Sequence, residues 1–168
     1  VSDFTDPDRP YEIAFFDRGP NSDSTLVGGG YWSAYWYNGH IYGSEMSRGL
    51  DVFSLTPSEF LTENEIKAAE SVKWEEFNPQ DQRKIVWPKT FVVARAYVDG
   101  LVRRDGLRGV WGTQIHNELN RIEKLGAPAR RAPLNALAAR LERDARALNT
   151  RDRERVLALA DVVRNLSR

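Results

Sequence analysis

The sequence predicts an α+β fold in which an antiparallel β meander is followed by a small antiparallel helical bundle. Residues 31–55 alternate β-forming side chains around Asn38-Gly39, the strongest kind of short hairpin signal. Residues 89–168 repeat apolar side chains with the period of a helix. Charge divides at the same place, with 7 Lys and Arg against 15 Asp and Glu before residue 89, and 17 against 9 from there on. We therefore expect a β segment over 1–56, a helix and irregular connector over 57–88, and a helical bundle over 89–168.

The first 30 residues precede the meander and contain one predicted strand. Asp and Pro dominate residues 1–10, which predicts a strand end and a turn. Residues 11–17, YEIAFFD, are predicted as a short strand, and a polar loop follows. The glycines at 28–30 predict a flexible lead-in or a bulge. They lack the Lys-Ser/Thr of a phosphate loop and the spacing of a dinucleotide-binding motif, so neither function is predicted.

The meander has three predicted strands, at residues 31–37, 40–45 and 50–55. Regular alternation places two sets of side chains on opposite faces of the first strand: Tyr31, Ser33, Tyr35 and Tyr37 on one, and Trp32, Ala34 and Trp36 on the other. Neither set is polar, so we expect burial on both sides. Three such strands need further layers above and below them.

Helix signals begin directly after the meander. TPSE at residues 56–59 and TENE at residues 62–65 both place a capping residue three positions before Glu. A helix should therefore begin at Pro57 or Glu63, and residues 74–88 should form an irregular connector.

Four amphipathic helices are predicted in the last 80 residues. Their apolar stripes contain, in order, Phe91, Ala94, Val98, Leu101 and Val102; Ile115, Leu119, Ile122 and Leu125; Leu134, Leu137, Ala138, Leu141, Ala145 and Leu148; and Val156, Leu159, Ala160, Val163 and Leu166. The breaks and caps are Asp105-Gly106, Gly126, Pro133 at the start of the third helix, and Asn149 or Thr150 at the start of the fourth. Short links predict antiparallel neighbours with one core, shared by Leu119, Ile122, Leu137, Leu141, Val156 and Val163.

Composition excludes several classes of function. The chain has no cysteine, which excludes disulfides, thiol catalysis and cysteine metal sites. No stretch approaches the roughly 18 apolar residues of a membrane span. No cofactor motif is found. A signal peptide and an initiating Met are both missing, so we expect a processed, trimmed or partial chain.

Two candidate ligand sites lie in the meander. Tyr31, Trp32, Tyr35, Trp36 and Tyr42 would make an aromatic platform for sugars or other flat ligands, or they pack as core. A metal site would draw on His40, Glu45 and Asp51. His40 and Glu45 lie five residues apart and so on opposite faces of a regular strand, which argues against that site.

No catalytic residue is predicted. Ser33 and Ser44 of the meander have no evident His–acid partners, and His116 is predicted as a lone surface histidine. The arginines of the basic helices suggest two hypotheses, that these helices bind nucleic acid or that they bind a protein partner. Because Arg143 to Arg155 alternate with acidic residues at helical spacing, a salt-bridged surface is favoured over nucleic-acid binding.

Residues 1–70 resemble the terminal part of an LVIVD-repeat protein. The resemblance rests on Ser2-Asp3 with Pro7 and Pro10, on the strand at 11–17, and on Gly49-Leu50-Asp51-Val52-Phe53. The chain departs from the repeat at Ser54-Leu55-Thr56-Pro57, where a helix signal begins. That family implies a bacterial β-propeller with upstream blades, an extracellular or cell-surface location, and no established catalytic residues. The bundle is similar to the FIMAH-type helical domain, whose namesake motif would correspond to Phe91–Arg95.

These observations predict a non-enzymatic binding or assembly module of an exported propeller protein. The alternative is the C-terminal part of a propeller enzyme whose channel site lies mainly upstream. A blade has four strands, and this meander supplies three. We therefore expect an upstream segment or a partner chain to pair with residues 50–55, where the backbone would otherwise be unpaired.

Overall fold

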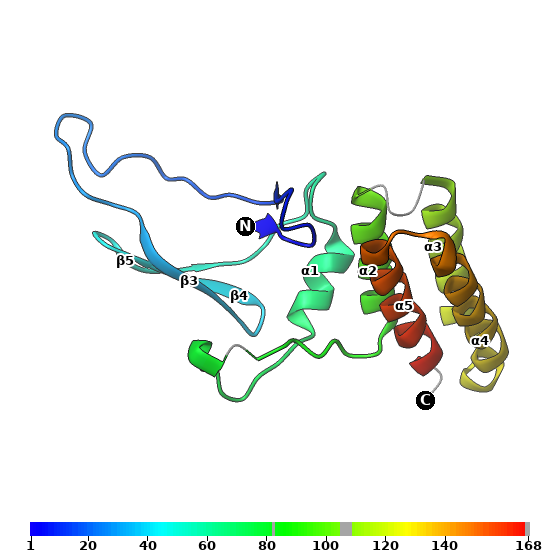
Figure 1. Ribbon diagram of the computed structural model, residues 1–168. Helices are drawn as coiled ribbons and strands as arrows, with labels where there is room; N and C mark the ends of the chain where they lie inside the picture. Colours follow the sequence, from blue (N-terminus) through cyan, green and yellow to red (C-terminus); the bar gives the residue numbers. More distant parts are fainter. Residues whose placement is uncertain (82, 105–108, 167–168) are drawn as a thin grey trace. The chain divides into compact units, whose positions relative to one another are not determined.

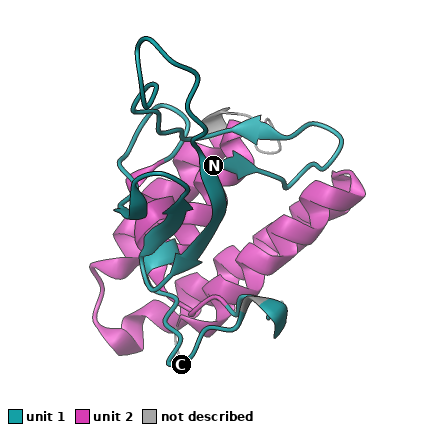
Figure 2. Ribbon diagram, turned by 90° about the vertical axis from the view of Figure 1, so that its left-hand side faces the viewer, with its two compact units in different colours: residues 1–61, 69–86 teal, residues 62–68, 87–168 magenta. Residues whose placement is uncertain are grey.

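A computed structural model describes residues 1–81, 83–104 and 109–166 of the chain. Within them a strand meander precedes a set of helices, which confirms the predicted α+β class (Figure 1). The chain forms two compact units, coloured separately in Figure 2. We call residues 1–61 with 69–86 the strand unit, and residues 62–68 with 87–168 the helical unit. The predicted break at Asp105-Gly106 lies outside the described residues.

The strand unit begins with a two-stranded sheet of β1 (Ser2–Asp3) and β2 (Tyr11–Glu12). The predicted strand over 11–17 is therefore mostly wrong. The N–H groups of Ile13 and Ala14 both point to the carbonyl of Val1, so the ladder has no further partner residues. A strand of this length stops where its neighbour ends, whatever its propensity.

The second sheet contains β3 (Tyr31–Tyr37), β4 (His40–Glu45) and β5 (Gly49–Phe53) in that order, all antiparallel. The turn between β3 and β4 has positive φ at both central residues, 50° at Asn38 and 105° at Gly39. This is the type I′ geometry that the Asn-Gly pair predicts. β5 ends at Phe53, two residues before the expected end.

A bulge changes the predicted faces of β3. Tyr31 pairs with Glu45 and Ser33 pairs with Ser44, so Trp32 is the extra residue. Tyr31 therefore shares a face with Ala34 and Trp36, and its predicted grouping with Tyr35 is wrong. Its ring packs over Gly43, where an added Cβ would lie 2.7 Å from a ring carbon.

Helix α1 (Glu63–Glu70) follows the second of the two capping signals. The Glu65 N–H donates to the Thr62 hydroxyl at 3.2 Å, and the Thr62 N–H donates to the Glu65 carboxylate at 3.0 Å. This reciprocal capping box fixes the start. A start at Pro57 is wrong, because the Ser58 hydroxyl and backbone close a local turn with Phe60 and Leu61 instead. The connector contains one short 3₁₀ helix, η1 (Pro79–Asp81).

The helical unit contains α2 (Phe91–Arg103), α3 (Gly109–Glu123), α4 (Ala127–Asp144), the 3₁₀ turn η2 (Ala145–Ala147) and α5 (Thr150–Asn165). α2 packs on α3 and α5, and α4 packs on α3 and α5. The six predicted core residues all lie in one buried cluster, at 0% or 1% exposure, which confirms the shared core. Asn149 caps α5 through its side chain.

The predicted start of α4 at Pro133 is wrong. The helix begins at Ala127, after the extended Gly126, with Pro128 in its first turn. A proline there loses no helical hydrogen bond, which makes Pro128 the better start signal. Arg130 also ties this first turn to the end of α3, because its guanidinium donates to the carbonyls of Glu123 at 2.6 Å and Leu125 at 2.8 Å.

Candidate functional site on the three-stranded sheet

The five residues of the predicted aromatic platform do not form one surface. Tyr35 and Tyr42 are cross-strand partners on one face of the sheet. Tyr31 and Trp36 lie on the opposite face, and Trp32 projects from the bulge at 78% exposure. Because Tyr31 and Tyr35 are also exposed, at 39% and 43%, the expected burial on both faces is not reached within the described residues.

An aromatic cluster nevertheless forms on the Tyr35 face, with residues that the sequence analysis placed only in a connector. Trp74 and Phe77 stack with ring centroids 5.4 Å apart, and Phe77 meets Tyr35 and Tyr37 at 5.9 and 5.8 Å. The Asn38 side chain anchors this segment by exchanging two hydrogen bonds with the Trp74 backbone, at 2.8 and 2.9 Å. Their aromatic character was the available signal that Trp74 and Phe77 would pack on the sheet.

The three candidate metal ligands have other partners. Glu45 is buried and accepts the N–H groups of Gly30 at 2.8 Å, Ser47 at 2.7 Å, and Arg48. These bonds, led by the one from Gly30, hold the pKa of Glu45 below its usual value. The Glu45 carboxylate therefore fastens the turn between β4 and β5 to the start of β3.

Asp51 and His40 are likewise engaged. Arg18 pairs with the Asp51 carboxylate, and the Tyr31 hydroxyl donates to it at 2.6 Å; the bond from Arg18 is the main reason that the pKa of Asp51 is lowered. The ring of His40 lies 3.2 Å from the Ser54 hydroxyl. In the described part of the chain, no three His, Asp or Glu side chains are grouped so that they could hold a metal.

The outer edge of β5 has no strand paired with it among the described residues. The two-residue turn makes Tyr37 and His40 a hydrogen-bonded pair, and such pairs alternate along antiparallel ladders. Every second residue of β4 points its backbone groups away from β3 and toward β5. The β5 partners of these residues include Asp51 and Phe53, so the backbone groups of Asp51 and Phe53 point toward β4. Those of Leu50 and Val52 then point to the outer edge, which has no paired strand in residues 1–81, 83–104 and 109–166.

The side chains of this edge are apolar and exposed. Leu50 is 68% exposed and Val52 is 54% exposed. Val52 continues the cross-strand row of Tyr35 and Tyr42 on the same face. The edge therefore offers unpaired backbone groups and an apolar row together, a combination that native sheets usually cover or interrupt with charge.

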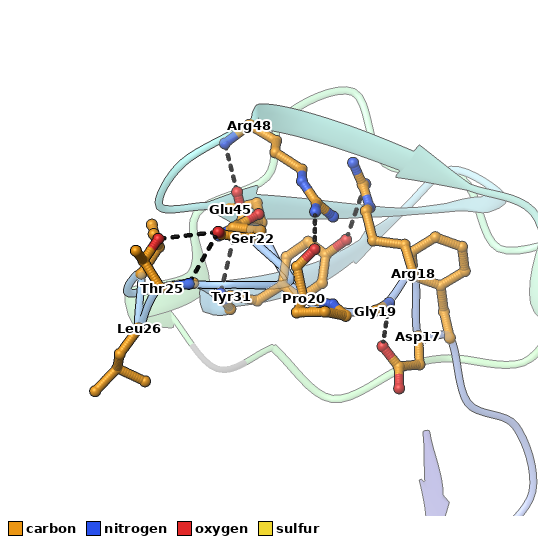
Figure 3. Close-up of a pocket in the computed structure, with 15 residues that line it drawn as sticks. Asp17, Arg18, Gly19, Pro20, Ser22, Thr25, Leu26, Tyr31, Glu45 and Arg48 are labelled. Carbon is orange, nitrogen blue, oxygen red and sulfur yellow. Dashed lines mark hydrogen bonds between the residues drawn. The ribbon is translucent and has the colours of Figure 1, made fainter.

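A cavity of about 450 Å³ lies beside the sheet, under the loop that leads into β3 (Figure 3). The loop residues 16–22, 25–27, 29 and 30 form its walls, with Tyr31 and Glu45 from the sheet and Arg48 from the turn between β4 and β5. In Figure 3 the guanidinium of Arg18 points toward Tyr31, and the guanidinium of Arg48 points toward Pro20.

The helical unit contains a polar cluster that the sequence analysis missed. His116 was expected to be a lone surface residue, but its Nε2 lies 2.6 Å from the Asp99 carboxylate. The second Asp99 oxygen accepts from the Thr62 hydroxyl at 2.7 Å and from the Asn64 amide at 2.9 Å. Asp99 therefore joins the start of α1 to α2 and α3 through three hydrogen bonds.

Arginines of the bundle serve largely as caps and ion-pair partners. Arg153 donates to the carbonyls of Ala145 and Leu148, at the end of η2. Arg140 pairs with Glu118 at 2.9 Å, and Arg164 pairs with Glu142. These contacts favour the interpretation of a salt-bridged surface. No helix in the described residues has both the length and the apolar character needed to cross a lipid bilayer.

Comparison with known proteins does not assign the chain to a family. No family model matches the chain, and neither a curated protein nor a solved structure matches it significantly. The similarity of residues 1–70 to LVIVD repeats and of the bundle to FIMAH-type domains therefore stays a prediction from sequence.

Proposed function

We propose that the strand unit is a non-enzymatic assembly module that accepts an extended polypeptide segment along the outer edge of β5. The observation that carries this proposal is the coincidence, at Leu50 and Val52, of outward backbone groups with exposed apolar side chains. Edge strands that add a further strand use these two features, the backbone for affinity and the side chains for specificity.

The energetics support a segment that forms a regular strand. Each new ladder hydrogen bond contributes about 0.5–1.5 kcal/mol, and full burial of a Leu or Val side chain contributes about 1.5–3 kcal/mol. Leu50 and Val52 are separated by one residue and lie on one face, so an incoming strand would place apolar side chains at every second position. A sheet of three strands gains a fourth in this way, the number found in a propeller blade.

The wider assignment is supported by sequence resemblance. We propose that this sheet is the terminal blade of an LVIVD-type propeller and that the protein works outside the cell or on its surface. A protein partner that binds the basic helices is a proposal independent of strand pairing at β5. The contacts of Arg130, Arg140 and Arg153 support a structural role for those three arginines.

The β5 proposal can be tested by backbone amide exchange on the whole chain. In the free protein, the amides of Leu50 and Val52 should exchange faster than those of Asp51 and Phe53, because only the latter pair with β4. A synthetic strand peptide that alternates valine with threonine and lysine should then protect Leu50 and Val52 selectively. Failure to protect them at saturating peptide would overturn the proposal.

Two substitutions sharpen this experiment. Val52→Lys should abolish peptide protection while leaving the β4–β5 ladder intact, since the backbone groups of Val52 point to the edge and its side chain is 54% exposed on one face. Val86→Lys is the matched control, because Val86 is an 83% exposed valine of the same unit outside the sheet. Equal loss of binding in both variants would indicate a general charge effect and contradict strand pairing at β5.

A further inference from the structure

The cavity beside the sheet is lined by two acidic and two basic side chains, and three of these four have local hydrogen-bond or ion-pair partners. Arg18 is paired with Asp51. Glu45 is satisfied by three backbone N–H groups. Asp17 accepts the Gly19 N–H at 2.8 Å. The fourth charged group, Arg48, is the cation of this lining that has no carboxylate partner within ion-pair distance in the described residues.

Arg48 is held in position, but most N–H donors of its guanidinium are not used in hydrogen bonds. Its backbone N–H is held by Glu45, and its guanidinium donates to the Pro20 carbonyl at 3.1 Å. Within the described residues, this is the only hydrogen bond of the guanidinium, and no carboxylate lies within 4.0 Å of it. A guanidinium has five N–H donors in a planar fork. Most of that fork is therefore available to a ligand.

The charges near Arg48 limit the kind of anion. Arg48 is close enough to contribute to the lowered pKa values of Glu45 and Asp51, so both carboxylates reduce its excess charge. A phosphate dianion would meet these carboxylates and Asp17 with one cation to balance it. A monovalent carboxylate matches the fork geometry and the single available charge.

The remaining lining is suited to an apolar body with a polar end. Phe16 and Val27 are half exposed, at 53% and 49%, and line the cavity together with the Tyr31 ring. The hydroxyls of Ser22 and Thr25 lie 2.9 Å apart in the same loop. At about 450 Å³ the cavity has the size of ordinary small-molecule sites.

We propose that this cavity binds a small monocarboxylate with an apolar or aromatic body, and that Arg48 holds the carboxylate. The inference does not depend on strand pairing at β5. It makes residues 16–31 and Arg48 a ligand-binding element, of which the sites predicted from sequence had included only Tyr31.

Benzoate is the probe, titrated into the ¹⁵N-labelled whole chain and followed by NMR. Shifts are expected at the Arg48 side-chain Nε–H and at the amides of Gly29 and Gly30, which line the cavity. Benzamide, which has the same body without the charge, should bind at least tenfold more weakly. Equal binding of the two, or no shift with benzoate at solubility-limited concentrations, overturns the proposal.

Three variants identify the group responsible. Arg48→Gln should weaken benzoate binding at least tenfold, and Arg48→Lys should recover part of it. Arg83→Gln is the matched control, since Arg83 is an arginine of the same unit that pairs with Asp81 away from the cavity. Unchanged amide spectra away from the cavity show that each variant is folded. Undiminished binding by Arg48→Gln contradicts the inference.

Discussion

Replacing Asp99 should uncouple α1 from the bundle. The Asp99 side chain is 10% exposed, and it accepts from Thr62, Asn64 and His116 at 2.6–2.9 Å. Asp99→Ala leaves these three donors without their acceptor. An unsatisfied buried donor costs about 1–3 kcal/mol, and partial access to water at His116 reduces the sum, so we expect a loss of about 2–4 kcal/mol of unfolding free energy.

The same site should give a defined pH dependence. Burial alone would raise the pKa of Asp99, but the hydrogen bonds from His116, Thr62 and Asn64 outweigh it and the pKa is lowered. A carboxylate with a lowered folded-state pKa adds stability above its unfolded pKa of about 3.9. That stability is lost as the pH falls through the folded-state pKa. The difference between the wild type and Asp99→Asn should therefore shrink below about pH 4.

Urea unfolding followed by ellipticity at 222 nm measures both effects, because the helices dominate that signal. Asp161→Asn provides the matched control: Asp161 pairs with Lys89 in an exposed position, where an ion pair contributes about 0–1 kcal/mol. A loss of unfolding free energy below about 0.5 kcal/mol for Asp99→Ala would refute the reasoning. So would a difference in unfolding free energy between the wild type and Asp99→Asn that stays constant down to about pH 2.5.

Three further substitutions test packing and turn geometry. Leu141→Ala removes a fully buried side chain and should cost roughly 2–5 kcal/mol in the same urea assay; a loss under about 1 kcal/mol would contradict the shared core. Gly43→Ala should displace the Tyr31 ring, since the new Cβ would lie 2.7 Å from it, and unchanged Tyr31 ring shifts in NMR would count against this packing. Gly39→Ala should destabilise the hairpin by roughly 1–2 kcal/mol because φ is 105°, and faster exchange of the β3–β4 amides would show it; unaltered exchange would not fit a type I′ turn.

The bundle could be predicted from sequence because its signals are local. Apolar residues three and four apart mark each helix, and the caps at Thr62 and Asn149 are read within four residues. Pro133 predicts a wrong helix start for the same reason. Its start signal is real in isolation, but the helix begins at Ala127, after the extended Gly126, with Pro128 in its first turn.

The hairpin of the sheet could be predicted from the sequence, but the face on which each side chain of β3 lies could not. Asn38-Gly39 determines the hairpin locally. The bulge at Trp32 instead depends on the pairing of Tyr31 with Glu45, whose carboxylate also holds Gly30. A one-residue shift moves a side chain to the opposite face, so no pattern within β3 alone could place Tyr31 correctly.

The candidate sites depend most on contacts that are distant in sequence. Asp99 and His116 belong to different helices and meet only when α2 and α3 pack. Arg18 reaches Asp51 across 33 positions. Charge and residue type marked these groups as candidates for ion pairs, but each side chain had several possible partners. Packing determines which partner is used and, at Arg48, which guanidinium has donors left for a ligand.

In the described residues, segments of the chain itself cover parts of both faces of the three-stranded sheet but not the β5 edge. Phe16 and Arg18 cover part of one face through Phe53 and Asp51, and Phe77 covers part of the other through Tyr35. Both segments belong to the strand unit, so the faces receive partial cover from the chain itself. The β5 edge differs because a side chain laid across a face cannot satisfy outward backbone N–H and C=O groups in a strand. Only another strand supplies matching groups at the right spacing, and it would also bury the apolar side chains beside them. The edge, more than either aromatic face, is therefore the part of this sheet where we propose that a polypeptide partner binds.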